Sequence, residues 1–173
     1  MDKALTPDEV WKVTGKKGNM VTYNQIQDYP SIDKLLRNNR CLILIQTHDE
    51  GPNIITGHYI CLLKKGKNIY FFDSYGTMID YQHYEIDEEY SKQVDQDYPA
   101  LSELLLNCPY TIHYNNKHLQ AKREGVATCG RWTGLFMRYN IPVEQFSNKF
   151  MNLKKNGYDI DQIVVDISNK YLY

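Results

Sequence analysis

The 173-residue sequence has no apolar stretch approaching the roughly 18 residues that a membrane-spanning helix needs. Its first ten residues, MDKALTPDEV, also lack the apolar core of a secretory signal peptide. These two absences predict an intracellular protein that does not associate with membranes.

An excess of charge of one sign is also missing. Twenty Lys and Arg residues face 21 Asp and Glu residues, which leaves a net charge of −1. The lysine clusters at 64–67 and 154–155 are too short to form basic tails. Since a general attraction for phosphates needs a basic stripe or patch, the composition does not favour nucleic-acid binding.

Cysteine is scarce, and the dense spacing of a secreted disulfide scaffold is absent. We therefore expect reduced thiols at the four cysteines, Cys41, Cys61, Cys108 and Cys129.

The sequence also has no C-x-x-C motif, so a structural zinc site is not indicated. Two pairs, His58 with Cys61 and Cys108 with His113, have short spacings. A separation of three residues along a strand places side chains on opposite faces, which argues against the first pair. We expect neither a metal ion nor a cofactor.

Apolar residues are plentiful enough for a real core. Hydrophobic residues make up 42% of the chain and aromatic residues 13%, which excludes a disordered protein. The length suits one domain over residues 1–173, and we expect a monomer.

Helix and strand signals alternate along the chain. Thr6, followed by Pro7 and Glu9, predicts a capped helix that ends before Gly15. Further helices are expected at 31–39, 99–107, 129–140, 143–153 and 161–172, and strands at 41–47, 60–63, 69–72 and 110–115. The acidic segment 80–97 has no period and is expected to be a surface excursion. The predicted class is α+β, with a central mixed or antiparallel sheet flanked by helices.

Cys129 begins the expected helix CGRWTGLFMRYN, whose apolar stripe is Trp132, Leu135, Phe136 and Tyr139. A helix N-terminus lowers the pKa of a thiol because its unpaired N–H groups favour negative charge. Thr128 is expected to cap this helix, and Gly130 to let a substrate backbone approach. Cys129 is therefore a candidate nucleophile.

A thiolate nucleophile needs an imidazole to carry its proton and a third group to orient that imidazole. His58 begins one strand of the expected hairpin and Asp73 ends the other, at similar distances from Gly66 in the turn. We expect the two side chains to face each other across the strand pair.

An oxyanion hole needs fixed hydrogen-bond donors, and the Cys129 backbone N–H is one candidate. Gln120, nine residues upstream, is the candidate for the second donor. Asn115 and Asn116 are substitutes for it.

The motifs GHY, YFFDSYG and TCG, in this order over residues 40–140, resemble the cysteine peptidases of the adenovirus maturation protease and Ulp1 type, within the papain-like superfamily. The resemblance implies a nucleophile at Cys129, a general base and acid at His58, an orienting carboxylate at Asp73 and an oxyanion donor at Gln120. The sequence departs from that group at Tyr59, where Trp is usual, and in the long interval from Gln120 to Cys129.

The resemblance implies a cysteine endopeptidase that acts on a protein or polyprotein. The compact chain and a composition typical of AT-rich genomes favour a viral maturation protease of the virophage or Polinton kind, which cuts capsid or core precursors. We expect it in the host cytoplasm, the virus factory or the virion. The alternatives are a processing peptidase for ubiquitin-like modifiers, an acetyltransferase with the same residue order, and an inactive interaction domain. An activating peptide or DNA stays open.

Overall fold

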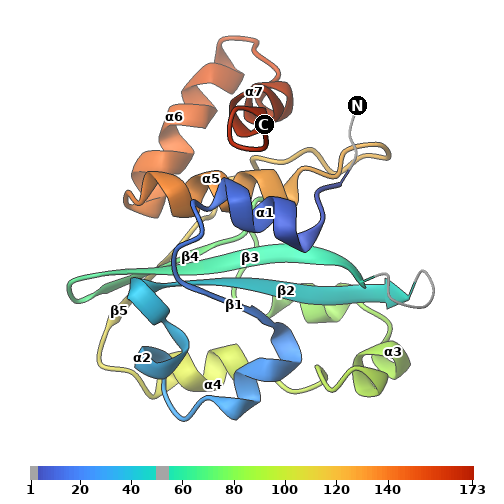
Figure 1. The fold of residues 1–173 in the computed structure, drawn as a ribbon, viewed down its shortest axis with the longest axis vertical. Coiled ribbons are helices and arrows are strands. Elements are labelled where there is room, and N and C mark those ends of the chain that lie inside the picture. The colour runs from blue at the N-terminus through green and yellow to red at the C-terminus, as the bar shows by residue number, and fades with distance from the viewer. Residues whose placement is uncertain (1–3, 50–54) are drawn as a thin grey trace.

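The computed structural model describes residues 4–49 and 55–173. A five-stranded sheet lies between two groups of helices (Figure 1). Its strands follow the chain order: β1 (Asn19–Thr22), β2 (Arg40–Asp49), β3 (Ile55–Lys65), β4 (Asn68–Phe72) and β5 (Thr111–Tyr114). The predicted α+β class with a mixed central sheet is confirmed.

The centre of the sheet is antiparallel, because β2 pairs with β3 and β3 with β4 in that sense. The two outer strands are parallel to their neighbours, β1 to β2 and β5 to β4. The four residues of β1 carry no clear alternation in the sequence, and this strand was not predicted.

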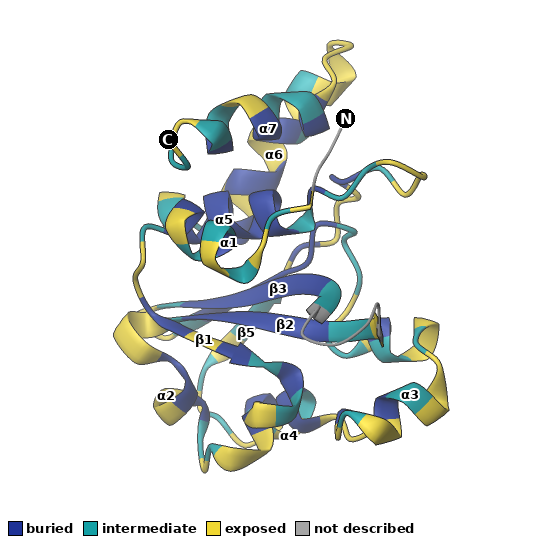
Figure 2. Cartoon of the chain, turned by 45° about the vertical axis from the view of Figure 1, so that its right-hand side comes forward, coloured by how far each residue is buried: buried dark blue, intermediate teal, exposed yellow. Residues whose placement is uncertain are grey.

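On one face of the sheet lie α1 (Pro7–Val13) and α5 (Cys129–Tyr139), with α6 (Val143–Lys155) and α7 (Ile160–Asn169) beyond them (Figure 1). Helix α5 lies between β3 and α7, and residues 130–137 are all buried (Figure 2). The predicted apolar stripe is therefore only part of the buried surface, while its last member, Tyr139, stays 38% exposed.

The other face is covered by α2 (Ile32–Leu35), α4 (Ala100–Leu106) and short 3₁₀ turns, η1 (Tyr23–Asp28) and η2 (Arg37–Asn39). Segment 80–97 forms η3 (Tyr81–Glu85) and α3 (Glu88–Gln93). The prediction of a surface excursion was wrong for Gln82, whose side chain is 7% exposed.

The predicted helix starts follow from their caps. The hydroxyl of Thr6 accepts from the N–H of Glu9, whose carboxylate accepts from the N–H of Thr6. Ser31 caps α2 in the same way, through the N–H of Lys34.

Two glycines allow α5 to approach its neighbours closely. A methyl group at Gly130 would lie 2.6 Å from Val10 Cγ2 and 3.2 Å from Tyr59 Cδ2. At Gly134 it would lie 2.7 Å from Val13 Cγ1 and 2.9 Å from Val13 Cβ. Since Cβ is fixed to the backbone, α1 would have to move to admit a side chain at 134.

We predict that Gly134→Ala lowers the free energy of unfolding by about 1 kcal/mol net, because the overpacking cost of about 1–3 kcal/mol exceeds the roughly 1 kcal/mol helix-propensity gain of alanine. Urea denaturation measures the change. Gln145→Ala, on an exposed position of α6, is the control that should not destabilise. Adding Val13→Ala to Gly134→Ala should cost less than the sum of the single changes, and simple additivity would contradict the packing account.

Candidate active site

His58 and Asp73 meet at the end of the β3–β4 pair. His58 Nε2 lies 2.8 Å from Asp73 Oδ1, and both side chains are buried. The two side chains face each other, as predicted, although they are two residues out of register, because Cys61 pairs with Phe72 and β4 ends there. Asp73 follows the last paired residue and reaches His58 diagonally.

The carboxylate of Asp73 accepts hydrogen bonds at both oxygens. Besides the imidazole, Oδ1 accepts from the backbone N–H of Tyr75 at 2.9 Å. Oδ2 accepts from the Thr77 hydroxyl and from Gln82 Nε2 at 3.0 Å. Burial works to raise the pKa of Asp73, but the bonds from His58, Thr77 and Tyr75 hold it below its usual range. Sequence reasoning missed Gln82, which no motif indicates.

Cys129 is the first residue of α5 and is half-buried. Thr128 occupies the N-cap position as predicted, but its side chain makes no cap hydrogen bond, and its hydroxyl donates instead to Asp161 Oδ1 at 2.6 Å. Among the described residues, none accepts a hydrogen bond from the Cys129 backbone N–H. The N–H groups of Arg131 and Trp132 donate to the Thr128 carbonyl, whereas the Cys129 N–H is left to the surroundings of the sulfur.

The thiol of Cys129 and the imidazole of His58 lie close enough to shift each other's pKa. Burial works to raise the pKa of Cys129, but His58 and the N–H groups of Tyr59 and Gly130 lower it below the usual value. Burial works to lower the pKa of His58, whereas Asp73 and the Cys129 thiolate raise it to about 10. The arrangement favours a thiolate beside an imidazolium.

Gly130 lies in the interior, so its predicted function, the approach of a substrate backbone, was wrong. It lets α5 pack on Val10 and on the ring of Tyr59. Tyr59 is buried under the start of α5, and its carbonyl accepts from the Thr133 hydroxyl at 3.1 Å. The residue after His58 therefore packs against the helix that begins at Cys129.

Gln120 is buried, and its amide is held from two sides. Its Oε1 accepts from the Ser74 hydroxyl at 2.7 Å. Its Nε2 donates to the Tyr75 hydroxyl at 3.3 Å and to the Val126 carbonyl at 3.4 Å. Both Nε2 bonds are long, so either hydrogen can be given to a better acceptor.

The two substitutes for Gln120 are placed differently. Asn115 donates from Nδ2 to the carbonyls of Asp73 and Lys117, at 2.8 and 3.0 Å, which uses both amide hydrogens. It joins the end of β5 to the end of β4. Asn116 is exposed.

Asp161, at the start of α7, holds both ends of the loop between Gln120 and Cys129. Oδ2 accepts from the Ala121 N–H at 3.0 Å, and Oδ1 accepts from Thr128 and, at 2.9 Å, from Trp132 Nε1. The long interval noted in the sequence is thus closed by one buried carboxylate. Asp161 lies 32 residues beyond Cys129, and no sequence signal joins them.

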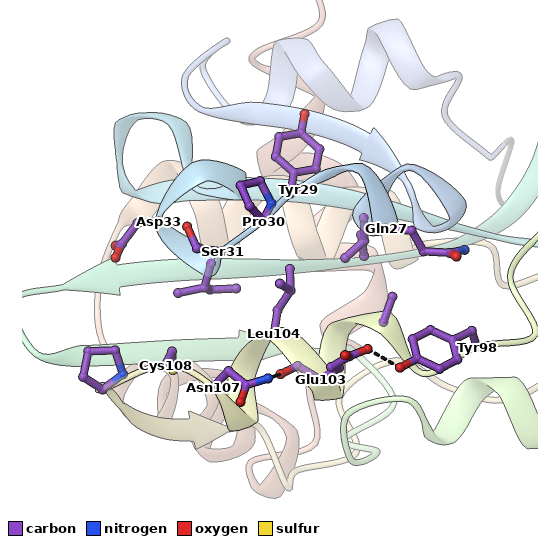
Figure 3. A pocket seen from close by; sticks show the side chains of 14 residues that line it. Gln27, Tyr29, Pro30, Ser31, Asp33, Tyr98, Glu103, Leu104, Asn107 and Cys108 are labelled. Carbon is purple, nitrogen blue, oxygen red and sulfur yellow. Dashed lines mark hydrogen bonds between the residues drawn. The ribbon is translucent and has the colours of Figure 1, made fainter.

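No group of three or more His, Cys, Asp or Glu side chains suited to a metal ion occurs within residues 4–49 and 55–173. A pocket of about 460 Å³ lies between residues 26–33 and residues 98–109 (Figure 3). It is on the sheet face opposite α5, and none of the four predicted site residues lines it. Across the same described ranges, no helix meets the length and apolarity required of a membrane span.

No protein-family model matches the chain. Over 131 residues it is 33% identical to "Uncharacterized protein V9" of Sputnik virophage, with 75% of this chain and 72% of the relative covered. This relative supports the expected virophage origin.

Among solved structures, the chain is similar to ChlaDub1 of Chlamydia trachomatis, with a TM-score of 0.46 and 13% identity over 99% of this chain and 94% of the other. The SUMO protease Ulp1 gives a TM-score of 0.40 and 13% identity, with 96% of this chain and 79% of the other covered. The ASFV pS273R protease gives a TM-score of 0.43 and 12% identity, with 85% of this chain and 62% of the other covered.

We predict that iodoacetamide modifies Cys129 faster than the other cysteines at pH 7, because His58 lowers its pKa. Without the imidazole, burial would raise that pKa, so in His58→Ala the rate should fall and its pH profile should move to higher pH. Peptide mass spectrometry measures the modification of each thiol. Cys108, also half-buried, is the internal reference, and faster labelling of Cys108 than of Cys129 would contradict a thiolate at Cys129.

Proposed function

The chain belongs to the family of uncharacterized protein V9 of Sputnik virophage, and we propose from its candidate active site that it is a cysteine endopeptidase. The name of that relative assigns no activity. The observation that carries the proposal is the 2.8 Å hydrogen bond between His58 and Asp73, together with the opposite pKa shifts of His58, which is raised, and Cys129, which is lowered. These are the three residue types that thiol hydrolysis needs.

In the first step, the Cys129 thiolate attacks the carbonyl carbon of the scissile peptide bond and a C–S bond forms. His58 then donates its proton to the leaving amine as the C–N bond breaks, and a thioester remains. Asp73 accepts from Nε2, which leaves Nδ1 for the sulfur and keeps the ring in one orientation.

In the second step, the neutral His58 takes a proton from water, and the resulting hydroxide attacks the thioester carbon. The C–S bond breaks, the carboxylic acid leaves, and the proton on His58 restores the starting pair with Cys129. No atom in this cycle has to come from a metal ion or a cofactor.

Each attack places a negative charge on the former carbonyl oxygen. The N–H of Cys129, which donates to none of the described residues, and the amide of Gln120 are proposed as its donors. Gln120 would exchange one of its long bonds for a shorter, charge-assisted one, so the gain is largest in the transition state.

For the substrate, we propose capsid or core precursor proteins that are cut during viral maturation. The virophage relative supports a viral substrate, and the motif resemblance supports a maturation protease.

The test is to incubate the purified protein with proteins from immature virions and, separately, with host-cell proteins, and to identify new N-termini by mass spectrometry. We expect new termini in the virion proteins and none in samples treated with Cys129→Ala, which removes the nucleophile at little packing cost. Identical termini from Cys129→Ala would refute the proposal. Cleavage confined to the host sample would redirect it to host modifiers.

We predict that Gln120→Ala lowers kcat about 10²–10³-fold with KM little changed, the effect of losing one oxyanion donor. Asn116→Ala, an exposed amide nearby, is the matched control and should keep full activity. Steady-state kinetics on a peptide taken from an identified cleavage site measure both. A loss below about threefold in Gln120→Ala, with Cys129 alkylation intact, would exclude Gln120 as the donor.

A further inference from the structure

Tyr75 contacts the imidazole that the proposed mechanism uses. It lies in the turn after β4, and its ring stacks on the ring of His58, with centroids 4.9 Å apart and planes inclined by 11°. Its backbone N–H donates to the same Asp73 oxygen that His58 approaches. The turn therefore contacts both the Asp73 carboxylate that binds His58 and one face of the His58 ring.

The hydroxyl of Tyr75 reaches the other group of the proposed site. It accepts from Gln120 Nε2 at 3.3 Å, while the neighbouring Ser74 donates to Gln120 Oε1 at 2.7 Å. Two consecutive residues therefore hold the two ends of one amide. The second Nε2 hydrogen points to the Val126 carbonyl over the longer distance of 3.4 Å.

The ring is also held from outside the site. The ammonium of Lys122 lies 4.9 Å from the ring centroid and pairs with Glu85 at 3.2 Å. Burial, with added repulsion from Cys129 and Asp73, raises the pKa of Tyr75 to about 12. The phenol is therefore neutral at pH 7 and keeps a lone pair for Gln120.

Resting on the peptidase activity proposed above, we propose that Tyr75 is a positioning residue that serves both halves of the site: its ring face stabilises the charged form of His58, and its hydroxyl holds one hydrogen of Gln120. The other hydrogen of Gln120, on the weaker bond to Val126, is then the one offered to the oxyanion. The side chain of Tyr75 thus contacts both His58, which carries the proton, and Gln120, which donates to the oxyanion.

The two contacts can be removed one at a time. A ring face beside a cation contributes about 0.5–1 kcal/mol, which corresponds to a two- to fivefold change in the ion-pair equilibrium. Tyr75→Leu removes the ring and the hydroxyl, whereas Tyr75→Phe removes only the hydroxyl. The phenylalanine variant should therefore retain the effect on His58 and lose the effect on Gln120.

The first experiment follows iodoacetamide modification of Cys129 against pH, which requires no substrate. Tyr75→Leu should react about two- to fivefold more slowly at pH 7, with its profile moved to higher pH, because a less stabilised imidazolium leaves less thiolate. Tyr75→Phe should match the wild type. Tyr84→Leu, an 87% exposed tyrosine, is the control, and thermal unfolding checks that each variant folds.

The second experiment measures kcat and KM on an identified cleavage peptide. Tyr75→Phe should lower kcat about fivefold with KM unchanged, as the loss of one neutral hydrogen bond predicts. In the Gln120→Ala background, the same change should have no further effect, because the hydroxyl acts through that amide.

Three outcomes overturn the inference. They are a Tyr75→Leu profile equal to that of the wild type, an alkylation defect in Tyr75→Phe as large as in Tyr75→Leu, and a Tyr75→Phe loss that persists in full without Gln120. If Tyr75→Leu does not fold, the Tyr75→Phe arms still decide the proposal for the hydroxyl. Failure of the peptidase proposal is separate, since it shows as cleavage that survives Cys129→Ala.

Discussion

A carboxylate buried at the end of a strand needs a donor at nearly every lone pair, and Asp73 meets this need from several parts of the chain. Its donors come from β3 through His58, from the following turn through Tyr75 and Thr77, and from η3 through Gln82. An unpaired buried charge costs several kcal/mol. The carboxylate therefore ties the strand, the turn and η3 into one arrangement around the imidazole.

A second carboxylate holds the segment that leads into Cys129. Asp161 accepts from Ala121, Thr128 and Trp132, so α7 holds the loop before α5 and the first turn of that helix together. Helix α5 also packs between β3 and α7, with Gly130 and the residues beside it buried. The start of α5, where Cys129 lies, is thus held by α7 and by the packing of the helix.

Local sequence patterns predicted those parts of the site whose structure depends on residues close together in the chain. Two short apolar runs on either side of the turn at Gly66 predicted the β3–β4 hairpin. A capping pattern predicted α1, and an apolar stripe predicted α5. The order of His58, Asp73 and Cys129 then indicated thiol chemistry. The register of His58 against Asp73 and the purpose of Gly130 were misjudged, because each depends on which distant element packs alongside.

The sequence by itself determined the α+β class, most of the helices and strands, and the residue types from which a thiol peptidase can be built. Only the tertiary structure decided that Gln82 and Tyr75 contact the Asp73–His58 pair. It also decided that Asp161 closes the loop before Cys129. Asn115, finally, donates its amide hydrogens to backbone carbonyls. The physical reason is that hydrogen bonding and burial act between residues far apart in the chain, and a buried polar group takes whichever partner the packing brings to it.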